Sequence, residues 1–202
     1  TVPASAIVGP VKQAGVKRLL VVGAGRVAAL VPEAFRQVLP IEVVQVWARQ
    51  ASQAKALVDE LRDGGFEASV ASDLAAAVAR ADVVSCATLA TAPVVQGAWL
   101  SPGSHLDLIG SFTPKMREAD DACFEGTRLF VDTSEALQKS GDLLGPMSRG
   151  VFSAQDVCGN LAELCAGAVP GRSADDQRTV FKSVGTALED LAAAALVFEA
   201  SA

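Results

Sequence analysis

A short apolar run followed at once by closely spaced small residues constrains this chain more than any other feature. Residues 19–22 read Leu-Leu-Val-Val, and Gly23-Ala24-Gly25-Arg26-Val27-Ala28 follows directly. An unbroken apolar run bounded by charge and glycine is typical of a buried parallel strand. The first glycine permits a tight turn, the second lets another group approach the backbone, and Ala28 lets a helix pack closely on the strand. The segment therefore predicts a strand, a tight turn and a helix.

Strand-like and helix-like segments alternate along the rest of the chain. This alternation predicts right-handed crossovers and an α/β fold, a Rossmann-type doubly wound parallel sheet with flanking helices. After the first strand, further strands are expected at residues 41–47, 67–70, 82–87, 105–109 and 128–132, with a strand or tight loop at 179–185. Helices are expected at residues 26–38, 52–62, 73–80, 118–123, 156–166 and 186–200, and a helix start with a Gly/Pro-rich loop at 133–150.

Two details of the helices are open to test. Pro32 lies inside the first helix, where it removes a hydrogen bond to the carbonyl of Ala28, so we expect a kink or a late helix start. Ser52 is a candidate N-cap for the second helix, and Ser72 or Asp73 for the third.

In this context the turn after the first strand predicts a dinucleotide-binding site. Free N–H groups and the positive dipole end at the start of the helix favour a diphosphate. A buried strand precedes the turn, a helix follows it, and a second strand comes about 20 residues later, which is the context that the motif requires. Gly23, Ala24, Gly25, Arg26 and Val27 are the candidate cofactor-binding residues here. The alternative is a glycine-rich turn that serves packing only.

The end of the second strand bears on the choice between NAD and NADP. A carboxylate there would bind the adenosine ribose and favour NAD. This chain reads Val46-Trp47-Ala48-Arg49-Gln50 and has no acid at that place. Because Arg49 can pair with a 2′-phosphate, we expect NADP to be favoured over NAD, with Ala48 and Arg49 at the site. Alternatively, Arg49 is a solvated surface charge.

Composition argues against several other classes of protein. The net charge is −6 and no basic run is longer than Lys17-Arg18, so we expect neither a nucleic-acid nor a membrane partner. No segment reaches the ~20 apolar residues of a membrane span. The start of the chain lacks the charged region of a signal peptide.

The cysteines predict neither a metal site nor a disulfide framework. Cys86, Cys123, Cys158 and Cys165 form no C-x-x-C pair, and His105 is the sole histidine. We therefore expect no metal. Cys86 and Cys165 lie in apolar runs, which favours buried, reduced thiols and a cytoplasmic location.

Several blocks of residues together resemble the ornithine cyclodeaminase/mu-crystallin family. The Phe-Lys-Ser-Val-Gly block with its downstream Glu-Asp is the most specific of them, and the resemblance runs over nearly the whole chain. The blocks are residues 22–28, residues 81–84, Leu108-Ile109-Gly110-Ser111-Phe112-Thr113-Pro114-Lys115-Met116-Arg117-Glu118, Ser140-Gly141-Asp142-Leu143 and Thr179-Val180-Phe181-Lys182-Ser183-Val184-Gly185-Thr186-Ala187-Leu188-Glu189-Asp190.

The resemblance implies a dinucleotide-dependent enzyme with a second domain. Members are cyclodeaminases, amino-acid dehydrogenases and ketimine or cyclic imine reductases that bind NAD or NADP. Their second domain, built mainly from the N-terminal part, forms a homodimer and supplies a substrate-binding Arg and a catalytic Lys. Here both would lie before Thr1. We therefore expect residues 1–202 to be a single NAD(P)-binding Rossmann domain, with 1–16 and 186–202 as flanking helical segments that contact the second domain.

The resemblance also assigns residues to the cofactor. Thr1 would contact the cofactor phosphates, although Pro3 and Gly9-Pro10 disrupt the helix that should follow it. Ala87 and Thr88 would run beside the ribose. Gly110 and Ser111 would lie at the ligand edge of the sheet, and Ser183, Val184 and Gly185 would form the turn over the nicotinamide.

One departure bears on the reaction. Cyclodeaminases of this family carry an acid–base Asp whose place falls at Phe112, and Phe cannot exchange a proton. The resemblance therefore favours an imine reductase or amino-acid dehydrogenase acting on an amino-acid or imine substrate. The alternatives are an ornithine cyclodeaminase and a non-catalytic, NADPH-binding crystallin-like protein.

Other polar residues have both a structural and a functional interpretation. For each of them we expect the structural one, except Lys182, where the two are equally weighted. Asp107 is either a hydrogen-bonded group near a strand end or a catalytic carboxylate, and His105 is either a surface residue at a strand start or a base. Lys115 and Arg117 are either solvated loop charges or substrate ligands. Lys182 is either structural or in contact with a ligand, and Asp190 either forms an ion pair on a helix surface or is a partner of Lys182.

Overall fold

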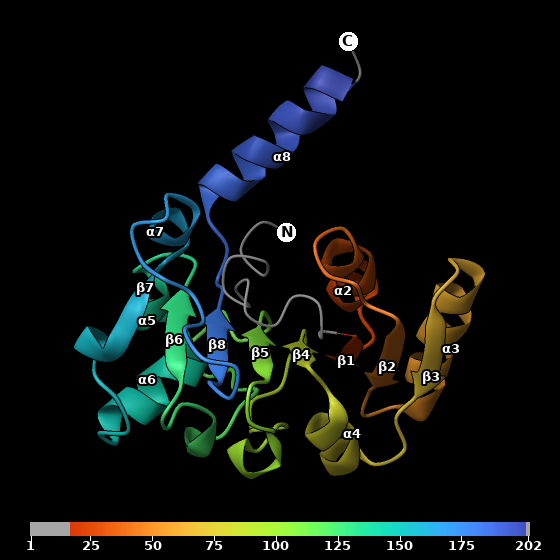
Figure 1. Ribbon diagram of the computed structural model, residues 1–202, viewed down its shortest axis with the longest axis horizontal. Helices are drawn as coiled ribbons and strands as arrows, with labels where there is room; N and C mark the ends of the chain where they lie inside the picture. The colour runs from red at the N-terminus through yellow and green to blue at the C-terminus, as the bar shows by residue number, and fades with distance from the viewer. Residues whose placement is uncertain (1–16, 201–202) are drawn as a thin grey trace.

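The computed structural model describes residues 17–200, which form one eight-stranded sheet with helices on both faces (Figure 1). Every paired strand runs parallel to its neighbour, in the order β3-β2-β1-β4-β5-β8-β6-β7. Thr1 and the segment 1–16 lie outside the described residues. The strands are β1 (Arg18–Val22), β2 (Val43–Trp47), β3 (Glu67–Val70), β4 (Val83–Cys86), β5 (His105–Leu108), β6 (Arg128–Val131), β7 (Val157–Asn160) and β8 (Thr179–Lys182).

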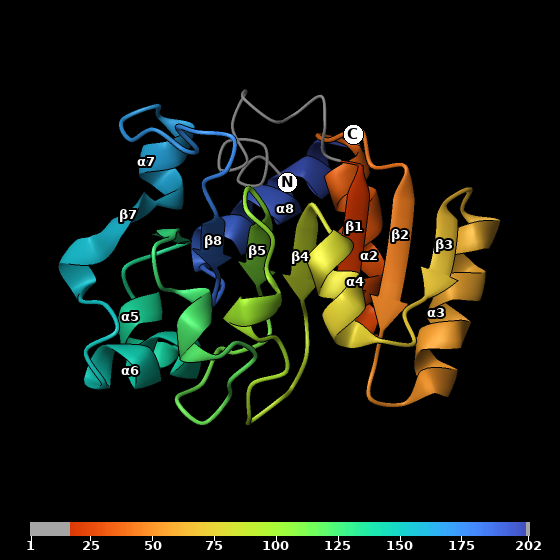
Figure 2. The same cartoon turned by 60° about the horizontal axis from the view of Figure 1, so that its bottom comes forward.

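The helices divide between the two faces of the sheet, which confirms the doubly wound α/β prediction (Figures 1 and 2). One apolar cluster joins α2 and α3 to the β1–β3 part of the sheet, and a second joins α4, α5 and α6 to its opposite face. The helices are α2 (Arg26–Arg36), α3 (Ala51–Asp63), α4 (Leu74–Arg80), α5 (Ala136–Lys139), α6 (Gly141–Ser148), α7 (Leu161–Cys165) and α8 (Ala187–Ala200), with 3₁₀ turns η2 (Gly97–Trp99), η3 (Asp121–Cys123) and η4 (Ala154–Asp156).

Strand β1 shows why its residues are continuously apolar. Leu19 and Val21 belong to the cluster with α2 and α3, whereas Leu20 and Val22 belong to the cluster on the other face. Successive side chains of a strand point to opposite faces, so a strand covered on both sides needs apolar residues throughout. All four side chains are buried.

The order of the strands produces two changes of direction. The chain proceeds from β1 outward to β3 and then returns to place β4 on the other side of β1. Later it lays down β6 and β7 and returns again, so that β8 inserts between β5 and β6. A change of direction in a parallel sheet leaves a crevice beyond the carboxyl ends of the strands, because the loops on either side diverge.

Several expected helix boundaries need correction. Helix α2 begins at Arg26, so the late start is wrong, and Pro32 lies in its interior as a buried residue. The N-cap of α3 is Gln50 without a side-chain hydrogen bond, so the prediction of Ser52 is also wrong. Asp73 does cap α4, accepting a hydrogen bond from Ala76 N.

The largest errors in the predicted secondary structure lie between residues 118 and 166. The helix expected at 118–123 is only η3, because Glu118 O accepts hydrogen bonds from Val94 N and Val95 N. Part of the predicted helix 156–166 is β7, which pairs with β6 at the edge of the sheet. Asn160 and Glu163 form a capping box that starts α7 only at Leu161.

The Gly/Pro-rich loop expected within residues 133–150 is mostly helical. Helix α6 covers Gly141–Ser148 and contains Pro146. The Cα of Gly141 packs against backbone carbonyls of the 114–116 segment, where a side chain would collide. A tertiary contact, rather than local propensity, therefore places this glycine in the first turn of a helix.

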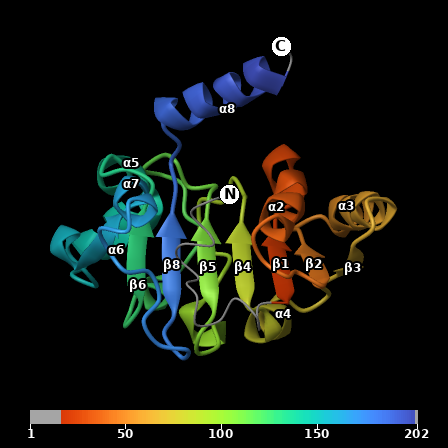
Figure 3. The ribbon, with the colours of Figure 1, turned by 45° about the horizontal axis from the view of Figure 1, so that its top comes forward.

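Two further findings concern exposure, and the first corrects a prediction. Cys86 is buried, as predicted, but Cys165 is exposed at the end of α7, and all four cysteines are free. Helix α8 leaves the body at the carboxyl edge of the sheet and extends away from it (Figures 1 and 3). Of its side chains that are described, every one is exposed, including Leu191, Leu196, Val197 and Phe198.

Candidate functional site

The turn between β1 and α2 has the geometry that its sequence predicts. Gly23 has a φ of +123° and donates a hydrogen bond from its N to Trp47 O at 2.8 Å. A Cβ atom at Gly23 would lie 2.6 Å from Ala87 O, so only glycine lets the turn pass beneath the loop after β4. Ala28 is fully buried in the cluster with β1.

Gly25 faces the opposite environment. A Cβ atom built there would meet nothing within 4 Å, and Gly25 is the N-cap of α2 without a side-chain hydrogen bond. The first-turn N–H groups of α2 therefore meet open space rather than a cap. Arg26 and Val27 are exposed beside them. These residues fit a diphosphate, because backbone donors and the helix dipole favour an anion at this end.

The loop after β2 borders the same turn. Trp47 pairs in register with Val22, so Ala48 and Arg49 follow the end of β2 next to Gly23. Ala48 is half-buried and Arg49 is exposed. An arginine in this place is free to reach an anion that lies beyond the carboxyl edge of β1 and β2.

A cavity of about 460 Å³ lies on the other side of the change of direction at β1 and β4. It brings together residues from α2, the loops after β4, β5 and β8, and the start of α8. Seven of the predicted cofactor residues line it, whereas Ser111 does not. The lining residues are Val27, Ala87, Thr88, Leu89, Asp107, Ile109, Gly110, Phe112, Phe181, Ser183, Val184, Gly185 and Glu189.

The buried carboxylate of Glu118 connects the loop after β4 to the loop after β5. One carboxylate oxygen, Oε1, accepts hydrogen bonds from Thr88 N at 2.7 Å and Thr88 Oγ1 at 2.8 Å. The other, Oε2, accepts one from Gly110 N at 2.7 Å. Glu118 is fully buried, and a Cβ atom at Gly110 would collide with its carboxylate and with Thr88. Burial raises the pKa of Glu118 to about 7, although Lys182 and the hydrogen bonds from Thr88 oppose the rise.

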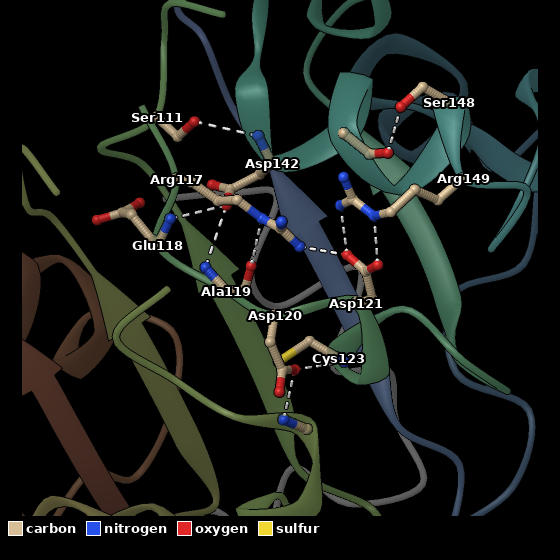
Figure 4. A network of polar contacts seen from close by, with 12 residues as sticks. Ser111, Arg117, Glu118, Ala119, Asp120, Asp121, Cys123, Asp142, Ser148 and Arg149 are labelled. Atoms are coloured by element: carbon tan, nitrogen blue, oxygen red, sulfur yellow. Dashed lines mark hydrogen bonds and ion pairs between the residues drawn. The ribbon is translucent and has the colours of Figure 1, made fainter. Parts of the chain in front are cut away.

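Glu118 belongs to a buried charged network (Figure 4). Asp142 Oδ1 accepts hydrogen bonds from Glu118 N and Ala119 N, and Asp142 Oδ2 lies 3.5 Å from Lys182 Nζ. The side chains of Asp142 and Lys182 are both fully buried. Lys182 is therefore a structural cation rather than a ligand contact, and Asp142, not Asp190, is its partner.

Ser111 lies in this network and not in the cavity. Its Oγ donates to Met116 O at 2.5 Å and accepts a hydrogen bond from Asp142 N at 3.2 Å. The residue is fully buried. The Ser111 hydroxyl is thus hydrogen-bonded within the loop that carries Phe112. That loop borders the cavity through Phe112, whereas the hydroxyl does not reach it.

Asp107 lies on β5 and lines the cavity from the strand itself. Its Oδ2 accepts a hydrogen bond from Ser85 Oγ at 2.7 Å, on the neighbouring strand. Burial raises the pKa of Asp107 to about 6, while the Ser85 hydrogen bond and the charge of Lys182 lower it. Asp107 is therefore hydrogen-bonded within the sheet, as we expect, and it also borders the cavity.

His105 is not the surface residue that we expected. It is 1% exposed, and its Nδ1 lies 2.8 Å from Thr179 Oγ1 on β8. Burial and the charge of Arg172 lower the pKa of His105 to about 3. The ring is at the amino end of β5, opposite the cavity, so a catalytic role is not indicated.

The remaining charged candidates differ from one another. Lys115 is an exposed loop residue, as expected. Arg117 is largely buried and forms an ion pair with Asp121, which also binds Arg149 (Figure 4). Asp190 is exposed on α8. Within residues 17–200 no group of His, Cys, Asp or Glu side chains could hold a metal ion.

Asp132 is one of three residues of the site that the sequence analysis missed, the others being Glu118 and Asp142. It directly follows β6, is 5% exposed, and its Oδ2 accepts hydrogen bonds from Val184 N and Gly185 N. An acid at the carboxyl end of a predicted parallel strand was the available signal, because such ends converge on the ligand edge. Glu118 and Asp142 carried no such local signal.

Comparison with known proteins decides the family. The family model described as ornithine cyclodeaminase/mu-crystallin matches residues 1–202. The chain belongs to this family. Delta(1)-pyrroline-2-carboxylate reductase of Paracoccus denitrificans is 47% identical over 185 residues, which cover 90% of this chain and 58% of that protein.

Solved structures agree with the fold and with the family. Delta(1)-pyrroline-2-carboxylate reductase of Thermococcus litoralis, solved with NADH and L-proline, has a TM-score of 0.92 at 31% identity, over 97% of this chain and 61% of that chain. An archaeal alanine dehydrogenase dimer with bound NAD has a TM-score of 0.87 at 30% identity, with the same coverage. This chain thus spans 58% to 61% of the length of these relatives.

Among the described residues, no helix has both the length and the apolar character needed to cross a membrane.

Proposed function

We propose that this chain is the dinucleotide-binding part of an NAD(P)-dependent reductase that acts on a ketimine or a cyclic imine carboxylate. The observation that carries the proposal is the arrangement around the change of direction in the sheet. The open Gly25 turn lies on one side and the 460 Å³ cavity on the other. The turn suits the diphosphate and the adenosine half of a dinucleotide, and the cavity suits the nicotinamide half. Relatives that reduce a pyrroline carboxylate support the substrate class.

The residues of the cavity suit the task of orienting a planar ring and excluding water from it. Val27, Ile109, Phe181 and Val184 supply an apolar wall. When bound, the reduced cofactor supplies the hydride, so the protein contributes binding, orientation and a dry environment. We place the substrate-binding Arg and catalytic Lys that the resemblance implies in the length that the relatives have in addition to this chain.

Titration with NADPH and NADH, followed by nicotinamide fluorescence, tests the cofactor part of the proposal. The chain should bind, and Gly25→Val should abolish binding while the protein stays folded, because the added side chain occupies the open space at the N-terminus of α2. Lys55→Ala, which removes an exposed cation on α3, is the matched control and should bind normally. No affinity of the unaltered chain for either dinucleotide would refute the proposal.

Oxidation of NADPH by Δ1-pyrroline-2-carboxylate tests the reaction, in a protein that contains this chain and extends over the full length of its relatives. Turnover is expected there. Phe112 is 49% exposed at the edge of the cavity and has no proton to exchange, so ornithine should yield neither proline nor ammonia. Formation of proline and ammonia from ornithine would favour an ornithine cyclodeaminase instead of a reductase. No turnover of any imine despite tight NADPH binding would favour a non-catalytic, crystallin-like protein.

Preference for NADP is a further part of this proposal, and it depends on Arg49. The exposed guanidinium next to the Gly23 turn can pair bidentately with a 2′-phosphate. Arg49→Ala should weaken NADPH binding by about tenfold and leave NADH binding unchanged, since a charge-assisted hydrogen bond contributes about 1.5–3 kcal/mol. Equal effects on the two cofactors would show that Arg49 is a solvated surface charge.

The partner and the location are proposals of the same kind. Exposed apolar side chains on α8, among them Leu191, Leu196 and Phe198, suit contact with the second domain of a homodimer. The archaeal relative solved as a dimer supports this arrangement. Sedimentation of the full-length protein should give a dimer. Four free thiols suit a reducing, cytoplasmic location, which fractionation of the source cells would test.

A further inference from the structure

The turn after β8 owes its shape to a carboxylate from the neighbouring strand. Asp132 follows β6, and its Oδ2 accepts hydrogen bonds from Val184 N at 2.6 Å and Gly185 N at 2.7 Å. The other oxygen, Oδ1, accepts one from Thr133 N at 2.7 Å. The Asp132 N–H itself donates to Lys182 O at 3.1 Å. A single residue thus fixes both the end of β8 and the turn beyond it.

The turn needs this partner because two successive N–H groups converge on one point. Gly185 has a φ of +84°, in the left-handed region, and its N–H donates to the same carboxylate oxygen as the N–H of Val184. Both hydrogen bonds are part-buried and share one charged acceptor, so we expect the turn to rearrange if the carboxylate is removed.

Asp132 contacts the turn from the side away from the 460 Å³ cavity. Ser183, Val184 and Gly185 line the 460 Å³ cavity, and Asp132 does not. Asp132 instead borders a second cavity, of about 800 Å³, between the ends of β6 and β7 and helix α8. Gly185 and Glu189 line both cavities, so the turn is the wall between them. The carboxylate therefore cannot act on a ligand in the first cavity by contact.

We propose that Asp132 is a positioning residue that holds the Ser183–Gly185 turn against the nicotinamide half of a bound dinucleotide. This inference rests on the proposed function. The N–H groups of Val184 and Gly185 are occupied by Asp132, and the turn that they belong to lines the cavity. Loss of the carboxylate frees the amides and displaces that wall, while the Gly25 turn, on the far side of β4 and β5, is unaffected.

Binding of a whole dinucleotide and of its adenosine half separates this role from a general structural one. NADPH, NADH and ADP-ribose are titrated calorimetrically into the unaltered chain and into Asp132→Ala, Asp132→Asn and Glu135→Gln. Asp132→Ala should weaken dinucleotide binding by about tenfold or more, since the displaced turn no longer supports the nicotinamide half, and should change ADP-ribose binding less than about twofold. Asp132→Asn should be intermediate, because its amide oxygen still accepts.

Glu135→Gln is the matched control. Glu135 borders the second cavity, lies three residues further along the same segment, and pairs with exposed Lys139 rather than with the turn. It should bind all three ligands normally. Equal losses for ADP-ribose and the dinucleotides in a folded Asp132 variant, or no loss at all, would overturn the positioning role. Failure of the unaltered chain to bind any of the ligands would instead refute the proposed function.

Amide hydrogen exchange keeps the inference testable if Asp132→Ala does not fold. In the unaltered chain the amides of Val184 and Gly185 should exchange slowly without ligand, because both are already bonded to Asp132. Addition of NADPH should leave those two rates within about twofold, whereas a turn shaped by the ligand would gain strong protection. Marked protection that appears only with NADPH would overturn the inference.

Discussion

The two halves of the carboxyl edge are built in different ways. The turn after β1 is shaped by its own backbone: Gly23 supplies a positive φ, Gly25 leaves the N-terminus of α2 open, and no side chain caps the helix. The loops after β4, β5 and β8 are instead held by buried carboxylates, Glu118 and Asp132, that reach them from other segments. The first half is therefore locally encoded, and the second depends on tertiary structure.

This difference should appear in how each half tolerates substitution. A substitution in the locally encoded turn after β1 can abolish ligand binding without unfolding the protein. Loops that share a buried charged network should lose stability and ligand binding together. Three substitutions test the comparison and a fourth, His105→Gln, tests the opposite end of β5; they are taken from the largest expected effect to the smallest.

Removal of the buried cation should be the most damaging. Lys182→Met leaves the carboxylates of Asp142 and Glu118 buried without it, and loss of one partner of a buried ion pair costs about 3–5 kcal/mol of the free energy of unfolding. Lys139→Ala, which breaks the exposed pair with Glu135, should cost less than about 1 kcal/mol. Urea denaturation measures both. Similar losses in the two variants would contradict a stabilising role for the buried network.

Gly110→Ala should destabilise the second half by overpacking. A Cβ atom there collides with the Glu118 carboxylate and with the backbone of Thr88, so the loops after β4 and β5 must separate, at a cost of about 1–3 kcal/mol. The same denaturation curve should show lower stability, and dinucleotide affinity should fall with it. A variant as stable as the unaltered chain would mean that these loops are not tightly held.

Acid should lower the free energy of unfolding through His105, which lies at the amino end of β5 and outside both halves of the carboxyl edge. Its pKa in the folded chain, about 3, lies below the ordinary value of 6.5, so the unfolded chain binds the proton first as the pH falls. Stability from this residue is therefore present above pH 6.5 and is lost progressively down to about pH 3. Asp107 and Glu118 act in the opposite direction, since their raised pKa values let the folded chain keep protons that the unfolded chain has lost.

A variant isolates the His105 contribution from these opposing groups. The difference in unfolding free energy between the unaltered chain and His105→Gln should shrink by about 2 kcal/mol between pH 7 and pH 5, at 1.36 kcal/mol per pKa unit. Urea titrations at the two pH values give that difference directly. An unchanged difference would show that the pKa of His105 is the same in the folded and the unfolded chain.

Gly25→Ala should have the smallest effect on stability and still weaken binding. The added methyl group meets nothing within 4 Å in the protein, so the free energy of unfolding should change by less than about 0.5 kcal/mol. NADPH affinity should nevertheless fall by about tenfold, because the methyl group occupies the approach to the α2 amides. A large loss of stability would show that Gly25 serves packing, as the alternative interpretation holds.

The same contrast explains how far the sequence could predict the structure. Strand β1 and its turn follow from adjacent residues and agree with the prediction, whereas the late start that Pro32 suggests for α2 is wrong. Glu118 acts on Thr88, thirty positions away, and Asp132 on Val184, fifty-two positions away, so no local pattern reveals either contact. His105 was misplaced for a related reason, since its burial depends on β8, which joins β5 only in the folded sheet.

The errors in secondary structure have the same cause. Val157–Asn160 has too few residues for a clear period and becomes a strand only because β6 offers a free edge. Gly141 and Pro146 both disfavour a helix, yet α6 forms because Asp142 accepts the amides of Glu118 and Ala119 from its first turn. Tertiary contacts override local preference at these places.

The position of β8 also bears on the order in which the molecule can be completed during synthesis. β5 and β6 both emerge from the ribosome well before Thr179–Lys182, yet each pairs with β8 along one edge. Without β8 the order of strands leaves two groups, β3-β2-β1-β4-β5 and β6-β7, each with an edge where another chain could add. Joining them requires a contact between distant parts of the chain, which is slow in parallel sheets. Nascent chains of this protein therefore pass through an interval of high aggregation risk that ends only when the last strand has entered the middle of the sheet.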